Sequence, residues 1–326
     1  MNGQQFEAEI REQPAVLAGL ADSGAAAQLA AAIGRRDPLF IGSGSSLFVA
    51  QLATLAWRRL GRRANALAAS EARFQALAHR GSCVVALSQS GRTADVLDAL
   101  DALDALEPAR TIALTNDVTS PLATRADVTI DLAAGPERAV PASKSVTAMA
   151  ALLLWTASRS AGGDAAAAAE LRAAAATLGK WFDADALPAM ERAAAALEPA
   201  HSIMVIGAGY GVPVAAEIAL KIKEASYRHA EGFAAGEFRH GSTAILDAAR
   251  GMVGLLDDWS TTSVGAVLEV ARAARTIVVT LDDAPAADGR FGPLYWIASG
   301  QLLALALARR AGIDSDTPRG LRKFLA

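Results

Sequence analysis

Small hydrogen-bonding side chains gather in the stretch LSQSGRTADV, between the apolar run CVVA and the helix-like pattern VLDALDAL. This strand-to-helix turn contains four polar side chains within six residues, namely Ser88, Gln89, Ser90 and Thr93. The free N–H groups and positive dipole of a helix N-terminus attract anions, and hydroxyl groups add further donors. Gly91 lets the backbone approach a ligand closely. A serine helix cap is the simpler interpretation, but four polar side chains exceed what a cap needs, so we favour an anion site.

A second loop of this kind follows the first apolar run of the chain, in IGSGSSLFVA. Its small polar residues are Ser43, Gly44, Ser45 and Ser46. A G-x-G pattern after a strand also occurs in dinucleotide-binding folds, but Leu47 stands where the third glycine of that fingerprint would be. No acidic residue clearly follows a second strand at the expected distance either. Two serine-rich loops at one sheet edge suit a single phosphate better than a pyrophosphate.

Charged residues share one helical face in the stretch AEIALKIKEASYRHAEGFAAGEFRHGS, residues 216–242. Glu217, Lys221 and Glu224 stand at positions i, i+4 and i+7 of the predicted helix. A solvated stripe of surface salt bridges is the usual meaning of such spacing. Here the stripe follows a G-x-G turn, and most of the other helix positions are apolar. A charged face on a largely buried helix needs a partner or a function.

Short apolar runs alternate with longer helical patterns along the chain, which predicts parallel sheets flanked by helices. The expected strands are 38–43, 83–88, 110–116 and 127–133, followed by 202–208, 251–257 and 275–281. PLFIGSG resembles IMVIGAG, and ARTI occurs twice, both at the same offset of 165 positions, which indicates a duplicated domain. We expect an N-terminal packing helix, a first domain, connecting helices and a second domain, in residues 1–24, 25–163, 164–200 and 201–326.

Composition narrows the class of protein. The chain has 326 residues, a formal net charge of −3 and a sequence pI of about 5.9. No basic patch stands out, which argues against a nucleic-acid partner. The longest uncharged apolar stretch, residues 148–157, is too short to span a bilayer, and the polar, acidic N-terminus argues against a signal peptide. Cys83 is the single cysteine, so no intrachain disulfide can form. We expect a cytoplasmic protein without a membrane partner.

The motifs resemble those of the sugar isomerase (SIS) domain family. SQSGRT is similar to its phosphate-binding signature, GSGSS to its preceding loop, and Ala69-Ser70-Glu71 to a segment between them. The resemblance implies an α/β fold of two tandem SIS domains, each a three-layer, flavodoxin-like sheet. That is the arrangement of the isomerase half of the glutamine–fructose-6-phosphate aminotransferases and of their deaminase-like relatives. The implied substrate- and phosphate-binding residues are Ser43, Gly44, Ser45, Ser46, Ser88, Gln89, Ser90, Thr93, Val140 and Ser143.

The same resemblance implies the catalytic residues. Glu224 would move a proton between C1 and C2 of the sugar, with Lys221 assisting and Glu217 orienting. His240 would open the sugar ring, often from the partner subunit. The tail Pro-Arg-x-Leu-x-Lys puts Lys323 at the position of the family's carbonyl-reactive lysine, although exposed tail charge is the plainer interpretation of the tail alone. His229 is expected to be structural.

Within the family, the loops favour the deaminase-like branch. Arg92 follows SQSG where the aminotransferases commonly have Glu, and ERAVPASKS, with Lys144 beside the sugar, resembles the deaminase-like loop. Gly241-Ser242 departs from the family's frequent Gly-Pro. No N-terminal catalytic cysteine is present, so we expect no glutaminase domain.

We therefore expect a phosphosugar isomerase and deaminase that releases ammonia from an amino-sugar phosphate such as glucosamine 6-phosphate. The alternatives are a fructosyl-amine 6-phosphate deglycase and a non-catalytic sugar-phosphate sensor. The expected partners are a sugar phosphate and a second copy of the chain in a homodimer with shared active sites. We expect no cofactor and no metal ion.

Overall fold

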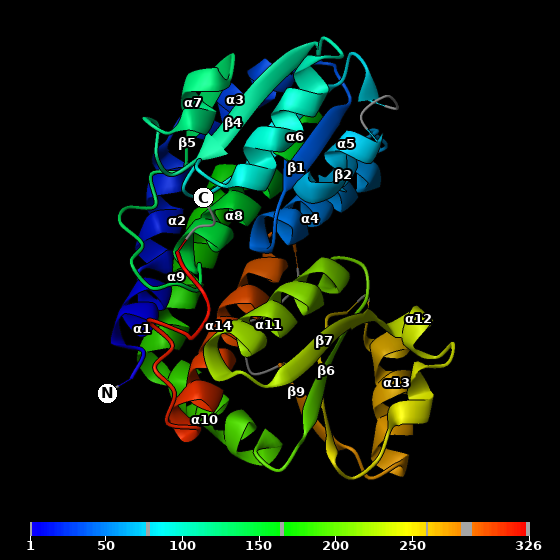
Figure 1. Cartoon of the computed structure of the whole chain (residues 1–326). Coiled ribbons are helices and arrows are strands. Elements are labelled where there is room, and N and C mark those ends of the chain that lie inside the picture. The colour runs from blue at the N-terminus through cyan, green and yellow to red at the C-terminus, as the bar shows by residue number, and fades with distance from the viewer. Residues whose placement is uncertain (1, 76–78, 164–165, 259, 282–288, 324–326) are drawn as a thin grey trace. The chain divides into compact units, whose positions relative to one another are not determined.

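A computed structural model describes residues 2–75, 79–163, 166–258, 260–281 and 289–323 (Figure 1). These residues form two compact units, each built around one parallel sheet. The β1–β5 unit contains residues 15–137 and 144–173 and the described chain from Arg322 onward, and the β6–β9 unit contains the rest. Residues 164–165, at the start of the expected connecting segment, and residues 324–326, at the end of the tail, lie outside the described residues.

The sheet of the β1–β5 unit has the strand order β2-β1-β3-β4-β5. Its strands are β1 (Pro38–Gly42), β2 (Asn65–Ala68), β3 (Cys83–Leu87), β4 (Arg110–Thr115) and β5 (Val128–Asp131). All neighbours are parallel, with Phe40 paired to Val85 and Val85 paired to Ile112. β1 and β3 are buried at every position, as continuous apolar strands are when helices cover both faces of a parallel sheet.

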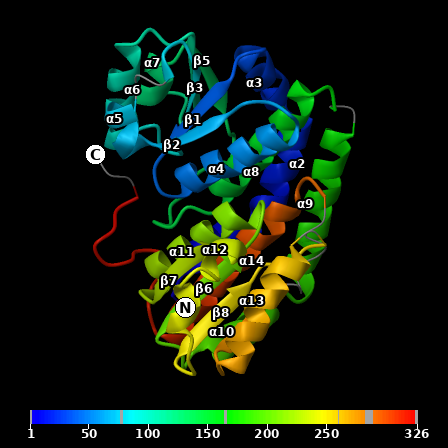
Figure 2. The ribbon, with the colours of Figure 1, turned by 90° about the vertical axis from the view of Figure 1, so that its right-hand side faces the viewer.

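Helices cover this sheet on both sides (Figure 2). One face carries η1 (Ala69–Glu71), α5 (Ala72–Gln75), α6 (Ala94–Asp104) and α7 (Pro121–Arg125). The other carries α3 (Ala25–Ile33) and α4 (Ser45–Arg59), with α8 (Lys144–Ser160) packed against both. α8 is buried from Lys144 to Ser158. Its alanines allow this close packing and favour the helix.

The sheet of the β6–β9 unit has the order β7-β6-β8-β9, again all parallel. Its strands are β6 (Ser202–Gly207), β7 (His229–Ala234), β8 (Arg250–Gly254) and β9 (Ile277–Thr280). α12 (Ala235–Phe238) and α13 (Thr261–Ala273) pack on one face, and η3 (Ser242–Ile245) lies beside α12. The other face carries α11 (Gly211–Ser226), backed by α14 (Gly292–Arg310), on which α1 (Gln4–Arg11) and α10 (Ala186–Leu197) pack. α9 (Ala167–Ala184) precedes α10.

α14 is the central helix of this unit. Every residue from Gly292 to Ala308 is buried. At its middle, Gly300 faces α11 so closely that a Cβ there would stand 2.3 Å from Cγ1 of Ile218. A side chain at position 300 would therefore force the two helices apart, which explains why a glycine occupies a helix interior despite its low propensity.

The two sheets confirm the expected duplication and the α/β fold. β1 and β6 are the second strands of their sheets and β4 and β9 the fourth, so the matched stretches occupy equivalent positions. The sequence did not predict β2 and β7. Both lie at a sheet edge, and both are only partly buried. Because β2 is only four residues long and β7 contains Glu231, their sequences carry little of the signal that marks the central strands.

Within the described residues, no single helix combines the length and apolar character needed to cross a membrane. The segment Gln4–Asp22, which contains α1 and α2 (Gln13–Asp22), reaches that length only when it is combined with α3, and a bend of 61° separates it from α3. Phe6, Leu17 and Leu29 of these helices are buried, with exposures of 0%, 1% and 0%. These segments therefore have the burial expected of core helices.

Candidate active site

The loop between β1 and α4 presents hydroxyl groups at a helix N-terminus. Its course requires two glycines: a Cβ on Gly42 would stand 2.8 Å from the carbonyl carbon of Ser46, and Gly44 has a φ of 54°. Ser43, Ser45 and Ser46 are half-buried at the start of the 15-residue helix α4. Exposed N–H groups and the helix dipole at this position favour an anion.

The second serine loop leaves the same sheet edge, because it follows β3, the direct neighbour of β1. It contains Ser88, Gln89, Ser90 and Thr93. Ser88 is 2% exposed and lies 3.0 Å from Thr93 through their hydroxyl oxygens. The Ser88 Oγ also accepts a hydrogen bond of 3.1 Å from the backbone N–H of Gly91. Ser88 therefore shapes the loop from within, whereas Gln89, Ser90 and Thr93 are half-buried.

The capping interpretation does not account for this loop. α6 starts after Thr93, whose side chain makes no capping hydrogen bond. The Ser90 hydroxyl accepts from the backbone N–H of Arg92 at 3.2 Å, before the helix begins. The loop is instead fixed to the end of β4, because the carbonyl of Gln89 accepts from the backbone N–H of Asn116 at 3.0 Å. These bonds hold the loop in place and leave the N-terminus of α6 to other acceptors.

Gly91 is the residue that makes the turn possible. Its φ is 62°, in the left-handed region that favours glycine. A Cβ at this position would also lie 2.0 Å from the Ser120 hydroxyl. Arg92, next in the chain, points outward and forms an exposed ion pair with Asp117 at 2.9 Å.

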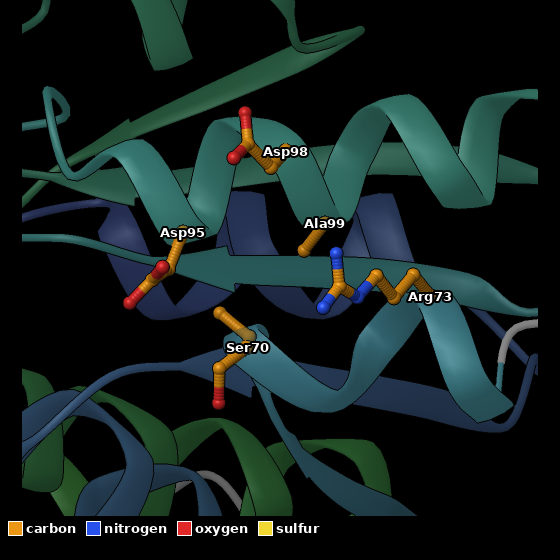
Figure 3. Close-up of a pocket in the computed structure, with 6 residues that line it drawn as sticks. Ser70, Arg73, Asp95, Asp98 and Ala99 are labelled. Atoms are coloured by element: carbon orange, nitrogen blue, oxygen red, sulfur yellow. The ribbon is translucent and has the colours of Figure 1, made fainter.

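A hollow of about 200 Å³ lies beside α6, the helix that follows this loop (Figure 3). Its lining comes from the Ala-Ser-Glu segment and α6, and comprises Ala69, Ser70, Arg73, Asp95, Asp98 and Ala99. Arg73 extends from α5 toward Ala99, and the carboxylates of Asp95 and Asp98 project from α6 (Figure 3). Two carboxylates and one arginine give this hollow a net negative charge, so the serine loops suit an anion better than the hollow does.

The acid–base candidates lie together on α11 in the β6–β9 unit. The Lys221 Nζ lies 2.5 Å from Oε2 of Glu224 and 3.7 Å from Oε1 of Glu217. The side chains of Lys221 and Glu217 are 2% and 3% exposed, whereas that of Glu224 is 22% exposed. The interpretation of this face as a solvent-exposed stripe of salt bridges is therefore wrong. The cluster is buried and reaches solvent through Glu224.

The turn before α11 brings this helix against the sheet. A Cβ on Gly207, the last residue of β6, would stand 2.2 Å from the carbonyl oxygen of Gly211. Gly209 between them has a φ of 54°. The G-x-G pattern seen in the sequence thus serves a close strand-to-helix turn.

The two histidines of this region lie outside the buried cluster. His240 is exposed in the turn after α12, where its backbone N–H donates to the carbonyl of Glu237 at 2.9 Å. His229 is exposed on β7, with its Nε2 3.4 Å from Oε1 of Glu231. The partner-subunit role of His240 stays a prediction.

The predicted substrate loop divides between the two units. Val140 and Ser143 belong to the β6–β9 unit, where the Val140 N–H donates to the carbonyl of Asp316 at 3.0 Å. Ser143 is fully buried, and its carbonyl accepts from Nε2 of Gln301 at 3.2 Å. Lys144 begins α8 in the β1–β5 unit and is 1% exposed.

Lys323 of the tail belongs to the β1–β5 unit. Its Nζ lies 3.2 Å from Oε2 of Glu137, whose side chain is completely buried. It is therefore more than an exposed tail charge, with a side chain that is only 20% exposed. No local sequence pattern indicates Glu137 as the partner of Lys323, because the two residues are 186 positions apart.

The comparisons with known proteins agree with the fold and the motifs. The model of the SIS domain family matches residues 35–159 and 196–288, more than half of the chain. The chain belongs to the SIS domain family. Among the described residues, no three His, Cys, Asp or Glu side chains group as metal ligands.

Individual relatives extend this result. The isomerizing glutamine–fructose-6-phosphate aminotransferase of Aeropyrum pernix is 36% identical in an alignment that covers 97% of this chain and 56% of that protein. The chain thus spans little more than half the length of that relative. The structure of glucosamine-6-phosphate deaminase from Thermotoga maritima is similar, with a TM-score of 0.85 and 23% identity over 99% of both chains.

The C-terminal domain of glucosamine-fructose-6-phosphate aminotransferase from Francisella tularensis has a TM-score of 0.84 and 23% identity, covering 97% of this chain and 98% of that chain. At 23% identity, both structural similarities establish the fold alone.

Proposed function

We propose that the protein is a phosphosugar isomerase and deaminase that acts on an amino-sugar phosphate such as glucosamine 6-phosphate. The products would be a ketose 6-phosphate and ammonia. The similarity to an aminotransferase with isomerizing activity supports this class of reaction.

One observation carries the proposal, namely the buried charge cluster on α11. Burying charged groups is costly even when they are paired. A sensor that only binds a sugar phosphate has no need of this cluster. Glu224 combines a 2.5 Å contact to Lys221 with the only substantial exposure in the cluster. It is therefore the member that a substrate can reach.

The proposed reaction assigns a task to each set of residues. The hydroxyl and N–H groups of the two serine loops bind the phosphate. Glu224 takes the proton from C2 of the open-chain amino sugar and returns it to C1, which moves the double bond to the C2–N position. Water then adds to C2 and ammonia leaves. Lys221 stabilises the negative charge that develops while the proton is transferred.

Exchange of a carbon-bound proton tests this assignment. Glucosamine 6-phosphate and fructose 6-phosphate are incubated with the protein in heavy water, and deuterium at C1 or C2 is followed by NMR. We expect exchange in the wild type and a loss of about 10²–10⁴-fold in Glu224→Gln, because general-base catalysis contributes that much. The control is Glu191→Gln, which makes the same chemical change at an exposed position of α10.

The outcomes separate the functional classes. Absence of exchange in the wild type with every phosphosugar tested, despite binding, would identify a sensor. Equal exchange in wild type and Glu224→Gln would place the base elsewhere. Ammonia release from glucosamine 6-phosphate supports a deaminase, whereas release of an amine only from fructosyl-amine phosphates supports a deglycase.

A mixing experiment tests the proposed sharing of His240 between subunits. Inactive Glu224→Gln and inactive His240→Ala are combined under conditions in which subunits exchange. If a site uses one residue from each chain, hybrid dimers regain one functional site, and activity returns. Continued inactivity in verified hybrids would show that Glu224 and His240 act within one chain or that His240 has no catalytic role.

A further inference from the structure

The carboxylate of Glu137 is a buried charge that the proposed reaction has not yet used. It lies at the N-terminus of the 17-residue helix α8. Its Oε1 accepts from the backbone N–H of Ser145 at 3.2 Å, and its Oε2 accepts from the Ser145 hydroxyl at 2.7 Å. The helix end and the hydroxyl fix this carboxylate in one position.

The same Oε2 atom accepts a hydrogen bond of 3.2 Å from the Nζ of Lys323. The side chain of Glu137 has no exposed surface, whereas that of Lys323 is 20% exposed. One end of the pair is therefore held by the protein and the other reaches solvent. Lys144, which precedes Ser145 in α8 and is 1% exposed, is a second cation of this region, and Arg322 beside Lys323 is exposed.

We propose that Glu137 positions Lys323 for imine formation with the C2 carbonyl of the open-chain ketose 6-phosphate, the sugar product of the proposed reaction, and exchanges the proton that this step requires. The inference rests on the proposed function and adds to it the role that the family resemblance implies for Lys323, that of the carbonyl-reactive lysine. An ammonium group is not a nucleophile, so Lys323 must lose a proton before it can react. Oε2 of Glu137 is already hydrogen-bonded to that ammonium group and can take the proton without a water molecule.

The step balances without any further reactant. The proton moves from the Lys323 ammonium to the Glu137 carboxylate, which leaves a neutral amine and a carboxylic acid. The amine adds to C2 of the open-chain ketose phosphate, and proton transfer gives a carbinolamine. Glu137 then returns its proton to the carbinolamine hydroxyl, water leaves, and the C2–N bond becomes a protonated imine. Glu137 ends the step as the carboxylate with which it began.

Trapping of the imine measures this step directly. Fructose 6-phosphate and sodium cyanoborohydride are added to the intact chain, and mass spectrometry follows a covalent adduct that peptide mapping assigns to Lys323. We expect Glu137→Gln to slow trapping by about 10²–10⁴-fold, the range of general acid–base catalysis. The affinity for fructose 6-phosphate, measured by calorimetry, should stay within threefold of the wild type. Glu198→Gln, which removes an exposed carboxylate paired with Arg310, is the matched control.

Chemical rescue distinguishes proton exchange from simple anchoring of the tail. In Glu137→Ala, added carboxylates can occupy the space left by the side chain. Acetate and fluoroacetate are similar in size and charge but differ in basicity. We expect the more basic acetate to restore trapping faster, and Glu137→Asp to retain more activity than Glu137→Gln. Equal rescue by both anions would indicate anchoring alone and overturn the inference.

Failure of the inference is distinguishable from failure of the proposed function. Wild-type deuterium exchange is measured on the same preparations. Exchange together with unchanged trapping in Glu137→Gln, or with no adduct on Lys323, would overturn only the role of Glu137. Absence of exchange in the wild type would overturn the proposed function itself.

Discussion

Replacing Lys221 by methionine tests whether the cluster on α11 is a buried electrostatic unit. The substitution keeps most of the side-chain volume but removes the ammonium group that lies 2.5 Å from Glu224 and 3.7 Å from Glu217. Breaking a buried ion pair by removing one partner typically costs about 3–5 kcal/mol. Water partly reaches Glu224, so the nearly inaccessible Glu217 should contribute much of this loss. We expect the free energy of unfolding to fall by about 3 kcal/mol or more.

Urea denaturation measures the effect. With a slope of about 3 kcal/mol per molar urea, the midpoint should fall by about 1 M or more. Adding Glu217→Gln to Lys221→Met should recover part of the loss, because it removes a second buried charge. The control is Lys180→Met at an exposed position of α9, which should change stability by less than about 0.5 kcal/mol. If Lys221→Met behaves like this control, the electrostatic account of the cluster is wrong.

Three further predictions concern the loop, the core and the response to acid. Gly91→Ala should destabilise the chain by about 1–3 kcal/mol, because residue 91 has a left-handed backbone conformation. Gly236→Ala should hardly change thermal unfolding, because a Cβ on Gly236 would meet no atom within 4 Å. Burial raises the pKa of Cys83 to about 11, so a disulfide reagent at pH 8 should label it only after denaturation; labelling of the native chain at the rate of free cysteine would contradict this. Burial pushes the pKa of Glu7 up, but hydrogen bonds from two arginines outweigh it and lower the pKa below 4.5. The resulting stabilisation is present above pH 4.5 and is lost as the pH falls through the folded-state pKa, so Glu7→Gln and wild type should converge in acid but differ at pH 7 in denaturation curves.

The central strands were predictable from the sequence because a strand that is buried on both faces consists of apolar residues at every position. The strand from Cys83 to Leu87 is apolar at every position, and each of these residues is buried. The edge strand His229–Ala234 has no such pattern, since it contains a charged residue and is mostly exposed or half-buried. The sequence therefore predicts the central strands and the edge strands β5 and β9, but not the edge strands β2 and β7.

The candidate site shows the same division between local and distant information. The shared face of Glu217, Lys221 and Glu224 follows from helical spacing alone, so the sequence predicted it. The depth of its burial did not follow, because the spacing of residues along one helix does not show what covers each face of that helix. The contact between Glu137 and Lys323 depends on chain topology, which no local pattern encodes.

The missing side chain at Gly300 has a mechanical consequence for proton transfer. Ile218 packs directly against the backbone of Gly300, so α11 has no space in which to shift toward α14 when a ligand binds. α14 thus limits the movement of α11, the helix that contains Glu224. A reacting carboxylate gains its precision from a stiff support as well as from its own neighbours. Under the proposed function, residues of α14 that do not contact the substrate would therefore help to set the distance between Glu224 and the reacting carbon.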